Sequence, residues 1–146
     1  MAKYFVYSEF IKSEKAKALG INNLPRTPEQ MDNILEVMRI MDRIREKWTK
    51  YCEDNFLQDP AIIITSGFRC DALNKALGGS KTSAHRVGSA CDFEARNGQN
   101  KALFGVCREV LKDIPFDQLI NERNYSWIHL GIRNLKGEQR REIKDL

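Results

Sequence analysis

The sequence predicts an α+β fold, in which a small, mainly antiparallel sheet carries helices packed on one side. Three patterns lead to this prediction. Apolar residues recur at three- and four-residue steps through 31–51, as in a long helix lying against a core. A β-branched run covers 61–65. Two further strand-like segments, 116–122 and 127–133, are separated by a short turn and predict a hairpin.

The N-terminal part, residues 1–26, is expected to hold one short helix and a linker. Ser8 can cap a helix over 9–19, and Gly20 can supply its left-handed end. The linker that follows contains asparagines and Pro25, which are frequent in irregular segments.

The long helix has a clear start. Thr27 is the expected N-cap, Pro28 suits the first helical position, and Gln30 stands where a capping box requires it. The helix must end before Pro60, because proline cannot continue it. Its apolar stripe predicts packing against a core.

The middle of the chain is expected to form two strands around a short helix. The run 61–65 predicts a strand that is buried on both faces. A helix over 71–77 ends at paired glycines. A second strand over 89–94 alternates so that Asp92 and Cys91 point to opposite faces.

The last part of the chain is expected to begin with a helix from 97 to about 113, ended by Pro115. The predicted hairpin follows it. The polar tail 134–146 is expected either to attach loosely or to add one edge strand.

Length and composition are those of a globular protein. At 146 residues, the chain is long enough for a single domain, 1–146, with its own core. It contains no apolar run near the roughly 20 residues of a membrane span. Its first residues lack a secretory signal, so we expect synthesis in the cytoplasm without a signal peptide. Four separated cysteines predict reduced thiols.

The net charge of +4 favours an anionic partner, either nucleic acid or the anionic bacterial cell wall. Basic residues are mixed with acidic ones, and no basic run is interleaved with aromatic residues. The sequence therefore predicts no nucleic-acid partner.

His85 is followed seven positions later by Asp92, with a glycine turn between them. With the second of the two histidines, His129, they supply the three protein ligands that catalytic zinc sites use while leaving a fourth position for water. An isolated histidine is more often structural, but here each histidine lies in or next to a predicted strand. Zinc lowers the pKa of bound water to roughly 7, so the predicted chemistry is hydrolysis.

Amide hydrolysis also needs a general base. A four-residue hairpin loop pairs Glu122 with Trp127 and Ile120 with His129, which places Glu122 on the face of His129. A register shift of one residue would turn Glu122 away. Asp117 is the alternative base, although this register places it on the opposite face, and Glu122 could instead be a solvated residue at the hairpin end.

Two further polar residues flank the predicted metal site. Arg69 follows the run 61–65 at a glycine turn, where its guanidinium could reach a substrate carboxylate or a developing oxyanion, or be a surface charge. Ser83 lies two residues before His85 and could hydrogen-bond substrate or cap a local turn. The spacing alone does not distinguish these roles.

Several motifs occur together in a fixed order between about Ile62 and Leu130. They are Ser66-Gly67-Phe68-Arg69, Leu73-Asn74-Lys75-Ala76-Leu77-Gly78-Gly79, Ser83-Ala84-His85-Arg86-Val87-Gly88-Ser89-Ala90-Cys91-Asp92, Phe116-Asp117-Gln118-Leu119-Ile120 and Trp127-Ile128-His129. Together they resemble the zinc D-Ala-D-Ala carboxypeptidase family, which includes phage endolysins and shares its zinc-site architecture with the hedgehog signalling domain. Tyr4-Phe5 and Ser8-Glu9-Phe10 resemble the family's N-terminal helix more weakly.

The resemblance implies a fold of the hedgehog and DD-peptidase type and a zinc peptidase that cuts the peptide stems of bacterial peptidoglycan. It implies His85, Asp92 and His129 as Zn²⁺ ligands and Arg69 as the substrate or oxyanion arginine. We assign substrate binding to Arg69 together with Ser83 and Trp127.

The base is transferred from the family less directly. Some members carry the acidic residue three positions before the last histidine, where this chain has Ser126. Others carry it on the preceding strand or turn, which Glu122 matches to within about a residue. Members also often have a second polar residue after the final histidine, where this chain has Leu130.

The predicted function is a D-Ala-D-Ala carboxypeptidase or an endopeptidase that cuts elsewhere in the stem. We expect a monomer that acts on the bacterial cell wall or in the periplasm after phage-type release, as an endolysin does. The alternative is a non-catalytic zinc-binding module of the same fold, which binds the cell wall or another protein.

Overall fold

The computed structural model describes residues 3–146 and confirms the predicted α+β architecture. A five-stranded sheet has the order β1-β2-β4-β3-β5. Its strands are β1 (Ile62–Ser66), β2 (Ala90–Ala95), β3 (Gln118–Glu122), β4 (Trp127–Gly131) and β5 (Glu142–Asp145). The pairings among β1 to β4 are antiparallel, and β5 pairs parallel with β3. The sheet is therefore mainly antiparallel, as predicted.

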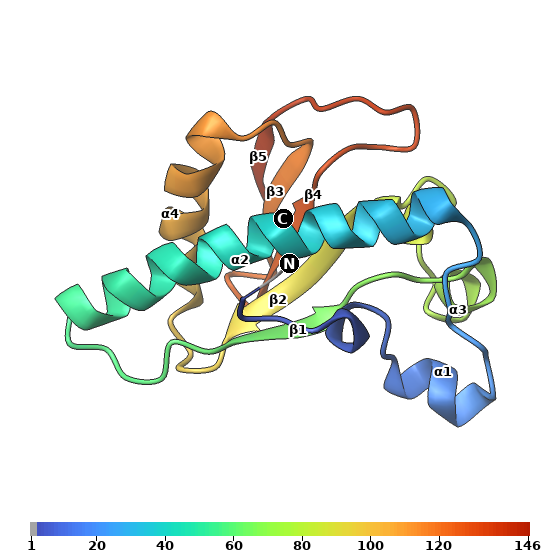
Figure 1. The fold of residues 1–146 in the computed structure, drawn as a ribbon, viewed down its shortest axis with the longest axis horizontal. Coiled ribbons are helices and arrows are strands. Elements are labelled where there is room, and N and C mark those ends of the chain that lie inside the picture. Colours follow the sequence, from blue (N-terminus) through green and yellow to red (C-terminus); the bar gives the residue numbers. More distant parts are fainter. Residues whose placement is uncertain (1–2) are drawn as a thin grey trace.

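Two helices cover one face of this sheet. Helix α2 (Pro28–Asp54) crosses the strands, and α4 (Asn100–Val110) lies beside it, whereas α1 (Glu14–Leu19) and α3 (Asp71–Ala76) lie together at one end of the molecule (Figure 1). Short 3-10 helices are η1 (Tyr7–Phe10), η2 (Ala84–Val87) and η3 (Leu111–Asp113). Within residues 3–146, no helix is both long enough and apolar enough to cross a membrane.

The core fills the space between the sheet and these two helices. The predicted capping box of α2 is present, since Thr27 Oγ1 accepts a hydrogen bond from the Gln30 N–H. The helix then buries Met41 and Trp48 against the sheet, and the alternation of β2 sends Cys91 into the same core. Each large apolar side chain buried in this way contributes about 1.5–3 kcal/mol to stability. Because side chains alternate along β2 and Cys91 points into the core, Asp92 lies on the opposite face of the sheet, as predicted.

The N-terminal helix differs from its prediction. Helix α1 begins only after Ser13, whose Oγ accepts a hydrogen bond from the Ala16 N–H, so Ser8 is not its cap. The carbonyl of Phe10 accepts a hydrogen bond from the Phe68 N–H at 2.7 Å, so it is not available to a continuous helix. The predicted left-handed end at Gly20 is confirmed by its φ of 67°.

The predicted burial of β1 on both faces is wrong. β1 is an edge strand of the sheet, and only one face of the sheet is covered by helices. Ile62 and Ile64 point into the core, whereas Thr65 is exposed. The β-branched run thus correctly predicted a strand but wrongly predicted its burial, because strand propensity does not indicate which other elements cover the strand.

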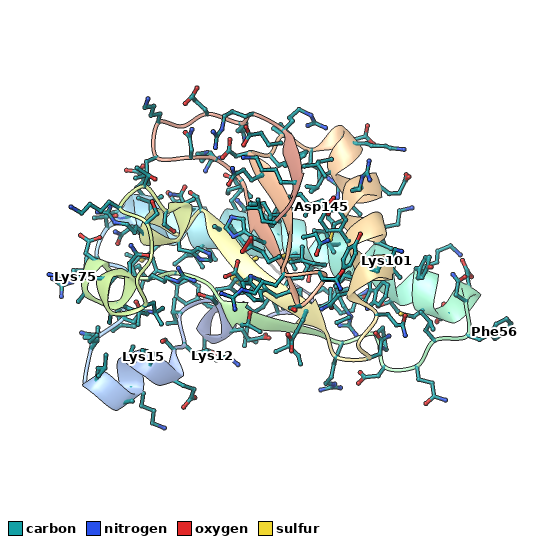
Figure 2. All side chains as sticks on the ribbon, turned by 180° about the vertical axis from the view of Figure 1, so that it is seen from behind. Lys12, Lys15, Phe56, Lys75, Lys101 and Asp145 are labelled. Carbon is teal, nitrogen blue, oxygen red and sulfur yellow. The ribbon has the colours of Figure 1, made fainter. Side chains whose placement is uncertain are left out.

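The C-terminal tail forms the edge strand that was one of its two predicted states. β5 pairs with β3, and Figure 2 shows it, with Asp145 labelled, on the side of the molecule away from α2. This pairing closes the β3 edge of the sheet.

Gly67, directly after β1, permits a close backbone contact. A Cβ atom built at this position would lie 2.2 Å from the Phe10 carbonyl oxygen. We expect Gly67→Ala to lower the free energy of unfolding by about 3 kcal/mol, because neither backbone can move without breaking the Phe68–Phe10 hydrogen bond. Denaturant unfolding measures this loss.

Gly105 is the matched control, because it lies within α4 and a Cβ built there has no neighbour within 4 Å. Gly105→Ala is expected to raise the free energy of unfolding by up to about 1 kcal/mol through helix propensity. Equal effects of the two substitutions would contradict the assignment of strain to Gly67.

Candidate metal centre

The structure brings His85, Asp92 and His129 together. Asp92 on β2 lies directly opposite His129 on β4, and His85 reaches the same point from η2. The Asp92 Oδ1 atom lies 2.8 Å from His129 Nδ1 and 3.4 Å from His85 Nε2. Donor atoms of all three side chains lie within 4.8 Å of one another. Two strands of the sheet and one 3-10 helix thus converge on one cluster.

The tautomer of His85 suits a metal ligand. Its Nδ1 atom lies 2.7 Å from the carbonyl oxygen of Gly67. A carbonyl only accepts hydrogen bonds, so Nδ1 carries the proton and Nε2 presents its lone pair to the cluster. Burial lowers the pKa of His85, which is only 3% exposed, and keeps the imidazole neutral.

Asp92 is the anionic member of the cluster. Burial by itself raises the pKa of this carboxyl, but the neighbouring imidazoles of His85 and His129 outweigh burial and hold the pKa well below its usual range. Arg69 Nη2 lies 3.5 Å from the other carboxylate oxygen, Oδ2. Asp92 is therefore ionised at neutral pH, the form that coordinates metals.

The donor set fits a zinc ion. Two imidazole nitrogens and one carboxylate oxygen are ligands that zinc takes, and bonds of about 2 Å to a common ion require donors a few ångströms apart, as they are here. His85 has its orienting partner in the Gly67 carbonyl. Three protein ligands leave a fourth position, as in catalytic zinc sites.

Arg69 is held at the edge of the cluster by three contacts. Its Nε donates to Ser66 Oγ at 3.0 Å, its Nη2 faces Asp92, and its backbone N–H donates to the His85 carbonyl. A β-bulge between Ile64 and Ser66 sets Ser66 opposite Asp92 in the sheet. The arginine side chain is only 17% exposed, so it belongs to the site rather than to the open surface.

Sequence reasoning missed Asn23, which it placed in a linker. This buried side chain donates from Nδ2 to the carbonyls of Ile11 and Phe68 and accepts from the Cys70 N–H, at 2.7–2.9 Å. It therefore ties the N-terminal segment to the two residues that flank Arg69. An asparagine in an irregular segment carries no periodicity, so no sequence pattern could have revealed this role.

The loop that carries His85 is fastened to helix α2. Asn33 donates to the Val87 carbonyl at 2.9 Å, and a Cβ atom at Gly88, where φ is 82°, would lie 2.8 Å from the Gln30 carbonyl oxygen. Ser83 caps η2, since its Oγ accepts from the His85 N–H at 3.2 Å. Of the two roles left open for Ser83, the structure shows the cap.

A hollow of about 320 Å³ lies beside the cluster. Its wall includes Ser83, Glu122 and His129. A larger hollow of about 480 Å³ along α2 and α4 has no histidine in its wall, so size does not identify the site.

The predicted hairpin register is confirmed, because Glu122 pairs with Trp127 and Ile120 pairs with His129.

Trp127 shares the strand face of His129 but does not line this hollow. The guanidinium of Arg123 lies 5.4 Å from its ring centroid, so one face of the indole is covered by its own turn.

Asp117 is placed differently from its prediction. It precedes β3, where strand alternation does not apply, and it lines the same hollow as His129 instead of facing the opposite side. Its carboxylate accepts hydrogen bonds from Arg140 N, Nε and Nη2 at 2.8–3.0 Å. A carboxylate held in this way is a poor general base, because hydrogen bonds from Arg140 engage both of its oxygens and stabilise the ionised form.

The Asp117–Arg140 pair predicts a dependence of stability on pH. Burial raises the pKa of Asp117, but the hydrogen bonds from Arg140 outweigh burial and lower it below the usual value of about 3.9. A depressed folded-state pKa stabilises the protein fully above about pH 4, and this contribution is lost as pH falls through the folded-state pKa. Denaturant unfolding from about pH 6 to 2 should show a smaller acid-induced loss in Asp117→Asn than in the unmodified protein. Identical losses in the two proteins would rule out this contribution.

Comparison with known proteins gives one family. The sequence model described as Peptidase M15 matches residues 3–131, a span that holds His85, Asp92 and His129. No curated protein matches the chain. Because the match covers most of the 146 residues and the predicted ligands meet in space, the chain belongs to the peptidase M15 family.

Proposed function

We propose that this metallopeptidase is a zinc-dependent hydrolase of the peptide stems of bacterial peptidoglycan, either a D-Ala-D-Ala carboxypeptidase or an endopeptidase. One observation carries the proposal. In a chain of the M15 family, His85, Asp92 and His129 converge beside a hollow whose wall includes an acidic side chain, Glu122. The combination supports hydrolysis rather than metal storage, because the acidic group is not itself one of the three ligands.

In this proposal His85 Nε2, Asp92 Oδ1 and His129 Nδ1 hold the zinc ion. When bound, the ion supplies Lewis acidity and makes water nucleophilic near neutral pH. Arg69 lies on the far side of Asp92, where its guanidinium neutralises negative charge on a substrate carboxylate or on the carbonyl oxygen. Its contacts with Ser66 and Asp92 hold it in place before substrate arrives.

Glu122 moves the proton. Its side chain lies on the strand face of His129 and in the wall of the same hollow. It accepts a proton from the attacking water and returns it to the leaving amine, so one carboxyl group serves both halves of the reaction. Ser83 lines the same hollow, which supports a hydrogen bond from its hydroxyl to the substrate backbone.

Digestion of purified peptidoglycan with the zinc-loaded protein, followed by mass spectrometry of the muropeptides, tests the proposal. Loss of a terminal alanine identifies a carboxypeptidase, and internal cleavage of the stem identifies an endopeptidase. The same digestion after metal chelation is the control and should show no cleavage.

Intact muropeptides in the presence of bound zinc would overturn the proposal. That outcome favours the alternative, a non-catalytic zinc-binding module of the same fold. The oligomeric state, for which we propose a monomer, is read from light scattering on the same sample.

A further inference from the structure

The hollow beside the cluster has one wall that the family match does not include. The match ends at residue 131, but Asn134 and Arg140 from the C-terminal segment line the hollow together with Ser83 and His129. A turn orders the start of this segment, since Asn134 Oδ1 accepts from the N–H groups of Lys136 and Glu138. Strand β5 fastens its end to β3. The C-terminal segment is thus built into the site.

Arg140 is the charged group of this wall, and it is held rigidly. Asp117, whose side chain is only 4% exposed, grips the guanidinium through two parallel hydrogen bonds, from Nε at 2.8 Å and Nη2 at 2.9 Å, and also accepts from the Arg140 backbone N–H. Glu142 Oε1 lies 3.7 Å from the same Nη2. A fork-shaped contact of this kind fixes the plane of the guanidinium.

The grip leaves one edge of the guanidinium free. Across residues 3–146, Arg140 Nη1 has no hydrogen-bond partner, while Nε and Nη2 are both engaged by Asp117. The side chain is 41% exposed, and the residue lines the hollow. Two N–H donors with a fixed direction therefore remain for a ligand.

We propose that Arg140 is a specificity-determining residue, which binds a side-chain carboxylate on a substrate residue next to the scissile bond. This inference rests on the proposed peptidase function and deepens it. The predicted substrate class is a peptide with two recognised carboxylates, one bound at Arg69 and one at Arg140. The two arginines serve different groups, because Arg140 lines the hollow together with Asp117, whereas Arg69 is tied to Asp92 and Ser66 and does not line it.

The charge balance limits how Arg140 works. Asp117 already compensates its positive charge, and Glu142 lies near, so the group exerts little long-range attraction. It selects through directed hydrogen bonds at short range instead. Replacing the substrate carboxylate by a carboxamide should therefore change binding markedly although the two groups have nearly the same shape.

Three matched stem peptides test the proposal with the zinc-loaded protein. The first has all carboxylates free, the second carries a carboxamide in place of the side-chain carboxylate next to the scissile bond, and the third carries a terminal carboxamide. Arg140→Gln is the direct variant. Since it leaves Asp117 buried without its partner, Asp117→Asn/Arg140→Gln is the variant that preserves a neutral hydrogen-bonded pair. Arg140→Lys tests rescue, and Arg108→Gln on α4, exposed and outside the walls of this hollow, controls for the lost charge.

We expect the unmodified protein to prefer the first peptide over the second about tenfold, mainly through KM, and Arg108→Gln to keep this preference. The two variants that lack the Arg140 charge, Arg140→Gln and Asp117→Asn/Arg140→Gln, should lose the preference for the first peptide. Arg140→Lys should keep part of this preference. The loss caused by the terminal carboxamide should be the same in all of these proteins. An unchanged preference in the two variants that lack the Arg140 charge would overturn the proposal. So would an equal loss on all peptides with zinc still bound, because that is the result of a merely structural role.

Calorimetric binding of the first and second peptides separates this inference from the proposed function. If the unmodified protein cleaves no stem peptide, the proposed function fails. The inference about Arg140 is then decided by whether the difference in dissociation constant between the two peptides disappears in Asp117→Asn/Arg140→Gln.

Discussion

Glu122→Gln is expected to reduce kcat for stem-peptide hydrolysis by about 10³-fold while the protein keeps its zinc, because a positioned general base contributes about 10²–10⁴-fold. Glutamine fills the same space but cannot accept and return a proton near neutral pH. Glu122 is not among the three clustered ligands, so metal content should stay at one ion per chain. Steady-state kinetics and metal analysis of the same preparation measure both quantities.

Two comparisons sharpen this result. Glu109→Gln, an exposed residue of α4, removes a carboxylate of the same kind away from the hollow and should leave kcat unchanged. Asp117→Asn tests the alternative base. A loss of 10²-fold or more in kcat for Asp117→Asn, with near-normal turnover in Glu122→Gln, would transfer the proton-moving role to Asp117.

His85→Ala is expected to abolish both stoichiometric zinc binding and hydrolysis. Two of the three donors remain in this variant, but Asp92 then keeps only His129 as an imidazole neighbour, and a two-ligand site does not retain zinc. The free energy of unfolding should also stop responding to added zinc, because a ligand stabilises a fold only by binding its native state. Metal analysis after dialysis and thermal unfolding with and without zinc measure these effects.

Asp71→Ala is the control for this experiment. Asp71 forms an ion pair with Arg86 in the same part of the molecule, but its side chain is 79% exposed, and pairs of this kind contribute little to stability. This variant should bind zinc and hydrolyse peptides normally. Retention of zinc at the unmodified affinity by His85→Ala would remove His85 from the ligand set.

The placement of Glu122 and His129 could be predicted from the sequence because a hairpin obeys simple rules. A four-residue turn sets the register of the two strands, and the register sets which side chains share a face. The same period of two predicted that Asp92 faces away from Cys91. These arguments use only neighbouring residues, so they needed no knowledge of the rest of the fold.

Asp117 and β1 mark where such local rules end. Asp117 precedes β3, so strand alternation does not predict the direction of its side chain. Its position depends on hydrogen bonds from Arg140, which lies on a segment that is distant in sequence. β1 has the composition of a fully buried strand but lies at a sheet edge, because burial depends on which layers cover an element. Helix α1 begins at Ser13 for a similar reason, since the Phe10 carbonyl is engaged by Phe68.

The sequence by itself determined most of the elements, the hairpin register and the identity of the candidate ligands His85, Asp92 and His129, because helix periodicity, strand alternation and donor chemistry are local properties. Only the tertiary structure showed the contacts that hold the site residues in place. The Gly67 carbonyl sets the tautomer of His85, and the Asn23 side chain anchors the segment around Arg69. The Asp117–Arg140 pair forms part of the wall of the hollow. Each is a hydrogen bond between residues far apart along the chain. Such contacts form only once the core has packed, so no periodicity in the sequence records them.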